Sequence, residues 1–587
     1  MLSPDARSVL SDALRPPPGS VLSRAVALTF TLDLESALVV PLAFAAAAVR
    51  ESSDPLAVME GVRRCADRVD VFCQAGNVRV PARYSDLLAF VEGMVHPVRP
   101  PRPGRLFHPK LWALRFWDEA EQVHTARLLV LSRNLTADRS WDVCLRLDGV
   151  LGTRPQASNR RLVDLIRRAV GLSVTAPGEQ RLAGIEELVQ DLRRVVWQPP
   201  AGVREVVFHA LGVPGAPPPD FDGSRYLVVS PFCTQAGLEV TAVGERVTIV
   251  SRQEELDRLP VEVLDGRDVL VVSELAGLPA DEADPGHSVL TGLHAKLYIV
   301  EKGHTARVLV GSANATDAAF GGNVELLVEL IGGRTQFGVD SMVGAAAPFR
   351  AMLEPYDRQA PVAPDEDERR LEDFVRQLAA VPLTATVTGG PDRHVVRLDS
   401  QTPLPVAEQV RVTAELVTRR GEAARLDAGQ PVHATFAGIT VVEVTPFILI
   451  TAQDRRGASV STVVLARLIG DPAGRLDELL ARQVDTPEKF LRFLALLLGL
   501  TGQPFGGLAG APGEGDQHPW VVAGGPGILE LLLRALVDRP DQLDDLGRLV
   551  ERMRSTDRGR GLLPEGFLQL WQTVDAARRE PAGKGAP

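Results

Sequence analysis

The chain of 587 residues is too long for a single hydrophobic core, and its length predicts three or four domains. Hydrophobic residues make up 45% and charged residues 24%, which is ordinary for a soluble globular protein. The net charge of -11 argues against a protein that coats nucleic acid through bulk positive charge, although it leaves room for a local basic site.

The cysteines show neither the spacing of metal ligands nor a disulfide framework; they are Cys65, Cys73, Cys144 and Cys233. The N-terminus lacks the charged-then-apolar layout of a signal peptide. The most apolar early run, residues 37–49, is too short to span a bilayer and predicts a buried helix. We therefore expect a cytoplasmic protein without membrane contact, bound metal or cofactor.

The first 200 residues alternate apolar, strand-like runs with amphipathic stretches, a pattern that predicts α/β layering. The expected strands are residues 68–74, 110–117 and 126–132, and the expected helices are residues 159–172 and 181–197.

The pattern restarts after a Pro- and Gly-rich stretch, residues 213–223, which we interpret as a linker or an exposed turn. The strand-like runs that follow are residues 225–232, 246–252, 268–274, 295–300, 306–312 and 324–330. We therefore expect a first α/β unit over 1–200 and a second over 201–355.

The remaining sequence predicts two further domains. An acid-capped helix over 364–381 precedes alternating runs joined by turn residues, which indicate a helix plus an antiparallel β domain over 356–472. The apolar runs after this indicate a helical C-terminal domain over 473–587. Within it, we expect a mobile loop over 501–519 and a disordered tail from residue 580 onward.

One phrase occurs twice in the chain. "VHTARLLVLSRNLT" begins at Val123 and "GHTARVLVGSANAT" begins at Gly303, and each ends in Ser-x-Asn-x-Thr. We interpret the shared histidines, His124 and His304, as strand-entry residues without a catalytic part. The shared Thr-Ala-Arg is interpreted as a record of duplication and common strand geometry.

A His-x-Lys pair precedes each copy of the phrase. Because residues two apart in a strand face the same side, each histidine and lysine should share one face. The six candidate catalytic residues are His108, Lys110, Asn134, His294, Lys296 and Asn314, with Ser132 and Ser312 beside the asparagines.

This set of side chains suits phosphodiester cleavage without a metal. One imidazole can attack phosphorus to form a phosphohistidine, while the other protonates the leaving oxygen and then activates water. Histidine suits both tasks because its pKa lies near neutrality. The lysines and asparagines can donate hydrogen bonds to the phosphate oxygens as charge develops on them.

The motifs resemble the signature of the phospholipase D superfamily over about residues 25–335. The second copy carries Gly311-Ser312-Ala313-Asn314, whereas the first has Leu131 in place of glycine and Arg133 in place of alanine. The resemblance implies two pseudo-symmetric α/β/α halves that share one active site. At the position of the family's third motif residue, an aspartate, this chain has Arg115 in the first copy and Glu301 in the second.

The resemblance also implies supporting carboxylates. "GGNVELLVEL" resembles the Asn-x-Glu that often follows the motif, which makes Glu325 a candidate to orient a catalytic histidine. Asp142, in "SWDVCLRL", is the weaker counterpart in the first half. Which histidine is the nucleophile stays open.

The family includes lipid hydrolases, nucleases, tyrosyl-DNA phosphodiesterases and kinase-like transferases. The basic stretch over 95–117 favours DNA, single-stranded DNA included, because a polyanionic strand binds a basic loop beside the motif. Its candidate nucleic-acid contacts are Arg99, Arg102, Arg105 and Arg115.

The whole layout resembles nucleases found with helicases or ATPases in bacterial anti-phage systems. It therefore predicts an antiviral effector with a helicase or ATPase partner subunit, and self-association stays open. The alternatives are a catalytically silent nucleic-acid-binding scaffold and a phospholipase that acts on lipid.

Overall fold

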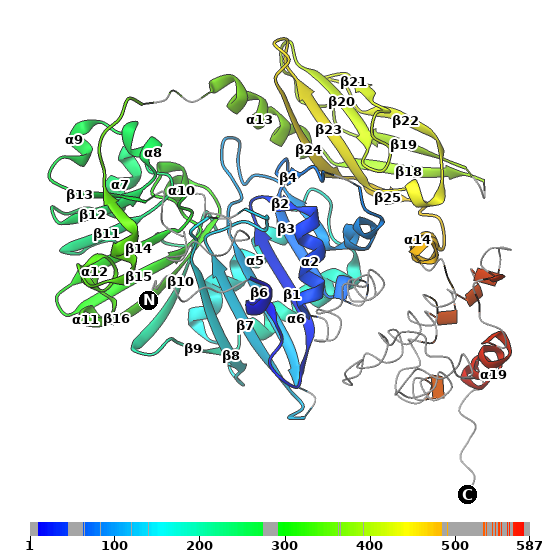
Figure 1. Ribbon diagram of the computed structural model, residues 1–587, viewed down its shortest axis with the longest axis horizontal. Coiled ribbons are helices and arrows are strands. Elements are labelled where there is room, and N and C mark those ends of the chain that lie inside the picture. Colours follow the sequence, from blue (N-terminus) through cyan, green and yellow to red (C-terminus); the bar gives the residue numbers. More distant parts are fainter. Residues whose placement is uncertain are drawn as a thin grey trace, which may run out of the picture.

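The structure, a computed structural model, describes residues 10–44, 65–273 and 292–483 apart from a few single positions. It also describes Arg63, isolated positions between 486 and 563, and helix α19 (Phe567–Arg579). The described part has a mixed α/β architecture, as the sequence predicts, with two large sheets next to each other (Figure 1).

The first large sheet has seven strands in the order β5-β3-β1-β6-β7-β8-β9. Strands β5, β3 and β1 are parallel to one another, and the remaining neighbours are antiparallel. The strands are β1 (Ser20–Thr29), β3 (Val69–Gln74), β5 (Val95–Val98), β6 (Leu111–Asp118), β7 (Val123–Leu131), β8 (Cys144–Leu151) and β9 (Val195–Gln198).

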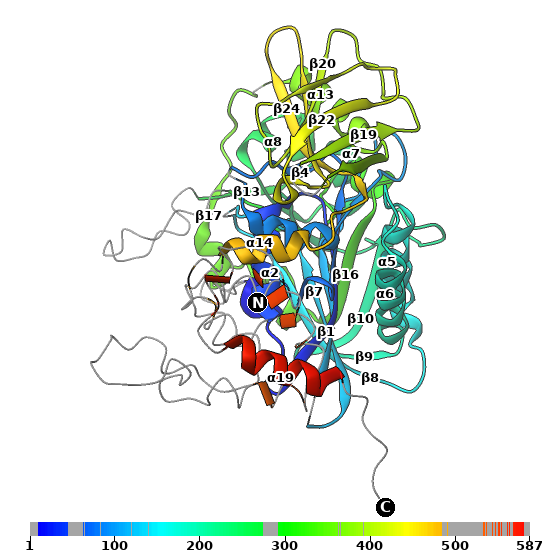
Figure 2. The ribbon, with the colours of Figure 1, turned by 90° about the vertical axis from the view of Figure 1, so that its right-hand side faces the viewer.

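Alternate residues of the central strand β1 face opposite layers, as the two-residue period of a strand requires. Ala25 and Ala27 pack with helix α2 (Leu34–Phe44), whereas Val26 and Leu28 pack in the core that includes α5 and α6. Helices α5 (Arg160–Gly171) and α6 (Glu179–Leu192) cover one face of the sheet and α2 covers the other (Figure 2).

The second large sheet has eight strands in the order β10-β16-β15-β14-β11-β12-β13-β17. Strands β11, β12 and β13 are parallel to one another, and β17 and the other strands pair antiparallel. The strands are β10 (Val203–Leu211), β11 (Arg225–Val229), β12 (Val247–Ser251), β13 (Asp268–Val272), β14 (Leu297–Lys302), β15 (Thr305–Gly311), β16 (Glu325–Gly333) and β17 (Leu353–Pro355).

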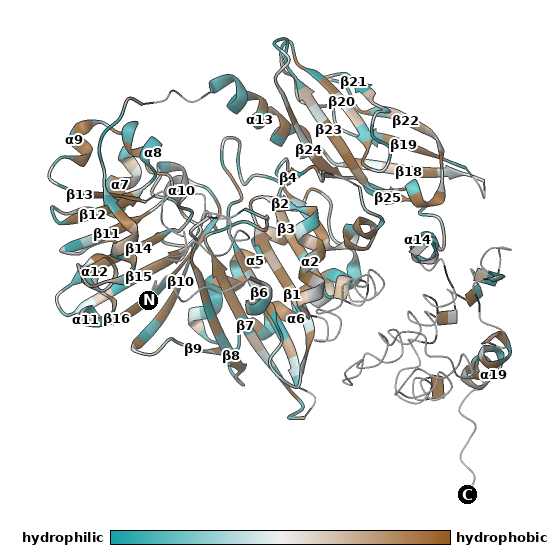
Figure 3. Cartoon of the chain, in the orientation of Figure 1, coloured by the Kyte–Doolittle hydropathy of each residue, from teal (hydrophilic) through white to brown (hydrophobic). Residues whose placement is uncertain are grey.

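Apart from the edge strand β17, the two large sheets share one spatial order, in which three parallel strands are followed by four antiparallel strands. The last of these is β9, which follows β8 in the chain, or β10, which precedes β11. In both sheets, a His-x-Lys segment leads into the fourth of these strands, β6 or β14, and the fifth, β7 or β15, leads to Ser-x-Asn. Apolar residues dominate the strands of both sheets, as expected for sheets covered on both faces (Figure 3).

The predicted helix over 181–197 is too long. Helix α6 ends at Leu192, and the β-branched pair Val195–Val196 enters strand β9, which is antiparallel to β8. Branched side chains fit a pleated sheet better than a helix, which explains the switch.

Residues 366–469 form a helix and two four-stranded sheets, in the orders β22-β19-β18-β25 and β21-β20-β23-β24. Asp365 caps helix α13 (Glu366–Ala379) by accepting from the backbone N–H groups of Asp367 and Glu368. All strand pairs here are antiparallel except β18 with β25. The strands are β18 (Leu383–Gly389), β19 (His394–Ser400), β20 (Arg411–Leu416), β21 (Ala424–Leu426), β22 (His433–Ile439), β23 (Phe447–Gln453), β24 (Ser459–Leu465) and β25 (Arg467–Ile469).

A buried ion pair joins the 3-10 helix η1 (Asp86–Met94) to helix α14 (Arg475–Gln483), because Glu92 accepts from Arg475 at 2.6 Å. Burial raises the pKa of Glu92 to about 7. The predicted loop over 501–519 and the tail from residue 580 lie outside the described residues, as do most of the predicted C-terminal helices. No helix in the described part is both long and apolar enough to cross a membrane.

Candidate active site

The two His-x-Lys segments lie where the two large sheets meet. The backbone N–H of His108 donates to the carbonyl of Val324 at 2.9 Å, and that of His294 donates to the carbonyl of Trp141 at 2.7 Å. Each histidine segment is therefore held by backbone from the opposite half of the motif region, which brings the two motifs into one site.

His108 has a carboxylate partner in the opposite half. Its Nδ1 lies 2.9 Å from Oε2 of Glu325, which also accepts a 2.5 Å hydrogen bond from Ser312 Oγ. Asn323 donates to the other oxygen of Glu325 at 3.5 Å. With Nδ1–H directed at the carboxylate, the lone pair of His108 lies on Nε2. The His108 side chain is 12% exposed, and the centre of its ring lies 4.9 Å from the centre of the Phe30 ring.

His294 is held differently. Its Nδ1 lies 2.9 Å from the Ser132 carbonyl and 3.0 Å from Lys296 Nζ. A neutral ring nitrogen cannot donate to a carbonyl and accept from an ammonium at the same time, so each tautomer makes only one of these bonds. His294 has no carboxylate partner among the residues that the structure describes.

Asp142, the predicted counterpart of Glu325, is paired with Arg133 instead. Arg133 Nε lies 3.3 Å from Asp142 Oδ2, although the two are not aligned as a hydrogen bond. The second copy of the motif has Ala313 where the first has Arg133, so only the first half has this competing cation. Burial raises the pKa of Asp142, and the charge of Arg133 opposes this rise.

Both motif lysines are buried, with exposures of 1% for Lys110 and 0% for Lys296. Lys110 Nζ donates to the His108 carbonyl at 3.0 Å, and Lys296 Nζ donates to the carbonyls of His294 and Ser132 at 2.8 and 3.2 Å. Burial lowers the pKa of Lys110 to about 7 and lowers that of Lys296 well below its usual value. Two buried ammonium groups with mainly carbonyl partners favour the binding of an anion between them.

The other titratable groups respond to the same surroundings. Burial, and then the charges of the two lysines, lowers the pKa of His294 to about 2 and that of His108 well below its usual value. Burial raises the pKa of Glu325 to about 8, although Lys110 opposes this rise. A bound anion would offset the lysine charges and raise the pKa of both histidines and both lysines.

The two motif asparagines lie in loops that are anchored in the same way. Thr29 Oγ1 accepts from the backbone N–H after Asn134 at 3.0 Å, and Ser230 Oγ accepts from the backbone N–H after Asn314 at 2.9 Å. Both Oδ1 atoms are shielded from solvent and have no hydrogen-bond partner among the described residues. Each amide therefore keeps an acceptor for which the described residues supply no donor, whereas only its Nδ2–H groups could donate to a phosphate oxygen.

Sequence reasoning missed three residues that shape the site. Phe30 packs on His108 and lies 5.7 Å from Lys110 Nζ. Gln74 Oε1 accepts from the N–H of the residue before His108, and Arg252 Nε donates to the carbonyl of the residue before His294, at 2.8 and 2.9 Å. Single residues at strand ends carry no motif, so only the fold identifies them.

The four arginines predicted to contact nucleic acid lie in three different surroundings. Arg102 and Arg105 lie beside Gly322, where an added Cβ would be 2.8 Å from Arg102 Nη2 and 3.2 Å from Arg105 Nε. They therefore border the segment that carries Glu325. Arg99 instead donates to the carbonyls of Val174 and Ala380, 3.1 and 3.3 Å away, and its bond to Ala380 ties it to the residues after α13.

The prediction for Arg115 is wrong. This residue is 7% exposed, and its guanidinium donates to Glu187 and Asp191, each at 2.8 Å. It ties strand β6 to helix α6 and has no surface for a nucleic acid. Glu301, at the same motif position in the second half, accepts from the N–H of Val339 and so anchors helix α12 (Val339–Val343).

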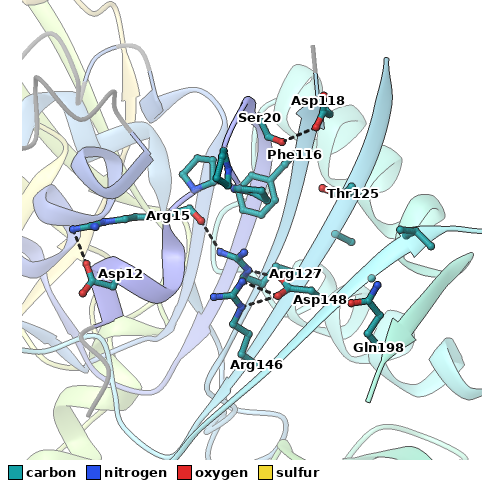
Figure 4. A pocket seen from close by; sticks show the side chains of 16 residues that line it. Asp12, Arg15, Ser20, Phe116, Asp118, Thr125, Arg127, Arg146, Asp148 and Gln198 are labelled. Atoms are coloured by element: carbon teal, nitrogen blue, oxygen red, sulfur yellow. Dashed lines mark hydrogen bonds and ion pairs between the residues drawn. The ribbon is translucent and has the colours of Figure 1, made fainter. Parts of the chain in front are cut away.

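A cavity of about 420 Å³ lies at the far end of strands β6 and β7, away from the histidines. Figure 4 shows Phe116, Thr125 and Arg127 lining it, and Arg127 is paired there with Asp148 at 2.6 Å. Among the described residues, no group of three or more His, Cys, Asp or Glu side chains is arranged to hold a metal ion.

Comparison with known proteins yields little. No family model matches the sequence, and no curated protein matches it. The crystal structure of polyphosphate kinase from Porphyromonas gingivalis is similar at 11% identity and a TM-score of 0.26, over 55% of this chain and 44% of that protein. The chain thus spans less than half the length of the kinase, and a TM-score this low carries no argument about function.

Proposed function

We propose that the chain is a phospholipase D-like phosphodiesterase that cleaves DNA through a phosphohistidine intermediate without a metal. The observation that carries this proposal is the convergence of two His-Lys pairs in one site, where His108 has a buried carboxylate partner and His294 has none among the described residues. Two buried ammonium groups suit a phosphodiester, whose charge increases in the transition state.

The proposal includes two pseudo-symmetric halves, over 1–200 and 201–355. The shared strand order supports it, as do the paired anchors Thr29 and Ser230, which hold equivalent loops by the same hydroxyl contact. Independent sequences would have no reason to repeat the contact, the strand order and the motif together.

In the proposed mechanism, His108 is the nucleophile. Its Nε2 lone pair attacks phosphorus to form a P–N bond, while the P–O bond to the leaving group breaks. Glu325 stabilises the positive charge that develops on the ring. The lysines and asparagines donate to the non-bridging oxygens.

His294 is the proposed general acid and base. It protonates the leaving oxygen in the first step, after the bound diester has raised its pKa. In the second step it takes a proton from water, which attacks phosphorus and breaks the P–N bond, so that His108 is restored. A carbonyl and an ammonium at Nδ1 let this ring change tautomer more readily than a carboxylate would.

DNA is the proposed substrate because Arg102 and Arg105 border the site and a polyanionic strand binds such cations. The domains proposed over 356–472 and 473–587 would dock a helicase or ATPase subunit, or a second copy of the chain. The complex would act in the cytoplasm as an anti-phage effector.

The test is DNA cleavage by the purified chain in EDTA, with His108→Ala and His294→Ala compared against His124→Ala. His124 lies outside the site, where its ring packs on Trp117 at 4.8 Å. We expect cleavage by the wild-type chain and His124→Ala, and none by the other two. Cleavage by both motif variants would overturn the proposal.

A catalytically silent nucleic-acid-binding scaffold is the second candidate. The observation that favours it is the pairing of Asp142 with Arg133, so that no carboxylate in the described ranges pairs with His294. DNA binding without cleavage or covalent adduct would establish this alternative.

A further inference from the structure

Gln74 and Arg252 occupy equivalent places in the two halves. Gln74 ends strand β3, and Arg252 directly follows strand β12, which takes the same place in its sheet. Each holds the backbone of the residue before a motif histidine, Phe107 or Leu293. The positioning task is the same, but one half uses a neutral amide and the other a cation.

The two side chains differ in the hydrogen-bond donors that they keep for a ligand. The Gln74 side chain is fully buried, and its Nε2 donates to the carbonyls of Ala75 and Val98 at 3.1 and 3.5 Å. Arg252 uses only Nε, and its two terminal nitrogens have no hydrogen-bond partner in the part of the chain that the structure describes. A guanidinium therefore remains free to donate beside His294.

An exposed aromatic ring lies directly under this guanidinium. Arg252 Cζ is 5.0 Å from the centre of the Phe232 ring, and Phe232 is 39% exposed. In the first half, the aromatic side chain that follows the anchor Thr29 is Phe30, and it packs instead on His108. The second half thus presents a cation and an accessible ring where the first half is closed.

We propose that Arg252 and Phe232 form a subsite for the nucleotide next to the scissile phosphate, on the His294 side, and that the substrate is single-stranded nucleic acid. This inference rests on the proposed function. The terminal nitrogens of Arg252 donate to the neighbouring phosphate, and the free part of the Phe232 ring stacks on the base. A paired base in a duplex has both faces covered by its neighbours, so stacking on Phe232 requires an unpaired base.

The test compares Phe232→Leu, Phe232→Tyr and Arg252→Gln with the matched control Arg246→Ala. Arg246 is an exposed arginine at the opposite end of the same strand, directly before Val247. Affinity for a fluorescent single-stranded oligonucleotide is measured by anisotropy, and kcat/KM is measured for that oligonucleotide and for bis(4-nitrophenyl) phosphate.

We expect oligonucleotide affinity to fall about 5- to 100-fold in Phe232→Leu, while Phe232→Tyr and Arg246→Ala stay near wild type. In Phe232→Leu and Arg252→Gln, kcat/KM should fall more for the oligonucleotide than for the small diester. Arg252→Gln also copies the residue type of the first half, so its anchoring bond can persist while the charge is lost.

Equal losses on both substrates would overturn the inference, because they would show that the pair only holds His294 in place. Unchanged oligonucleotide affinity in Phe232→Leu would overturn it as well. The anisotropy measurement does not depend on catalysis. If the wild-type chain binds the oligonucleotide more tightly than Phe232→Leu but cleaves neither substrate, the proposed subsite is supported and the proposed activity is refuted.

Discussion

Replacing Glu325 with glutamine preserves the shape of the side chain but removes the carboxyl group that faces His108. Burial raises the pKa of Glu325 to about 8, and positive charge that develops on His108 favours its ionised form. Glu325 Oε2 receives hydrogen bonds at 2.5 Å from Ser312 and at 2.9 Å from His108 Nδ1. In the proposed mechanism, positive charge develops on His108 as its Nε2 bonds to phosphorus. The Glu325→Gln variant should therefore slow the first chemical step more than it weakens substrate binding.

The size of the effect follows from these two contacts. A hydrogen bond to a charged group is worth about 1.5–3 kcal/mol. Since about 1.36 kcal/mol corresponds to a tenfold change in rate, losing the charge on the His108 bond alone predicts a decrease in kcat of about 10- to 150-fold. Rearrangement of the Ser312 bond as well would extend the decrease to about ten-thousandfold.

Asp142→Asn is the matched control, because Asp142 has the equivalent place in the first half but, where the structure describes the chain, it pairs with Arg133 and makes no hydrogen bond to a motif histidine. Its effect on kcat should be less than about tenfold, the loss expected of a partly screened charge. For both variants, the rate of cleavage of a chromogenic diester is measured in single-turnover experiments. An equal loss in the two variants, or a Glu325→Gln variant with wild-type kcat, would refute the assignment of Glu325 to His108.

Three other predictions concern the lysines and the motif glycine. Above about pH 7, the affinity for sulfate should fall by up to about tenfold per pH unit, because an anion binds protonated Lys110 and burial lowers the pKa of that lysine to about 7. Equal sulfate affinities by calorimetry at about pH 6 and about pH 8 would contradict this. Lys296→Met should abolish activity but stabilise the fold, because it removes a buried ammonium whose burial lowers its pKa. The melting temperature should rise by about 2–4 °C for each kcal/mol gained in the free energy of unfolding. A lower melting temperature in scanning calorimetry would contradict this explanation. Gly311→Ala should lower the free energy of unfolding by about 1–3 kcal/mol, because its Cβ would be 2.1 Å from the Leu326 carbonyl oxygen. The control Gly333→Ala has open space around the new Cβ, so urea titrations should show a smaller decrease in its free energy of unfolding. Equal decreases in the two variants would refute the packing argument.

The motif residues could be predicted because their spacing is local. His-x-Lys and Ser-x-Asn are each read within a few positions, and the apolar runs between them gave strands close to those observed. The pairing across the halves could not be predicted from spacing. His108 and Glu325 lie 217 positions apart, and backbone hydrogen bonds between residues 106–108 and Val324 bring them together.

Other outcomes depended on packing that a single sequence does not reveal. Arg115 was grouped with the basic loop by its charge, but its carboxylate partner Asp191 lies 76 positions away on helix α6. Asp142 could be placed beside the second histidine by symmetry, but the neighbouring Arg133 pairs with it instead. In both cases ion pairs decided the role of the residue.

The central claim is that His108 forms the covalent intermediate and His294 transfers the protons. Rapid-quench mass spectrometry with 4-nitrophenyl phosphodiesters tests it directly, because the good leaving group reduces the need for a general acid in the first step. The account predicts a phosphoryl adduct on the His108 peptide that accumulates in His294→Ala and is absent from His108→Ala. An adduct on His294, or no adduct in a chain that still cleaves the substrate, would contradict it.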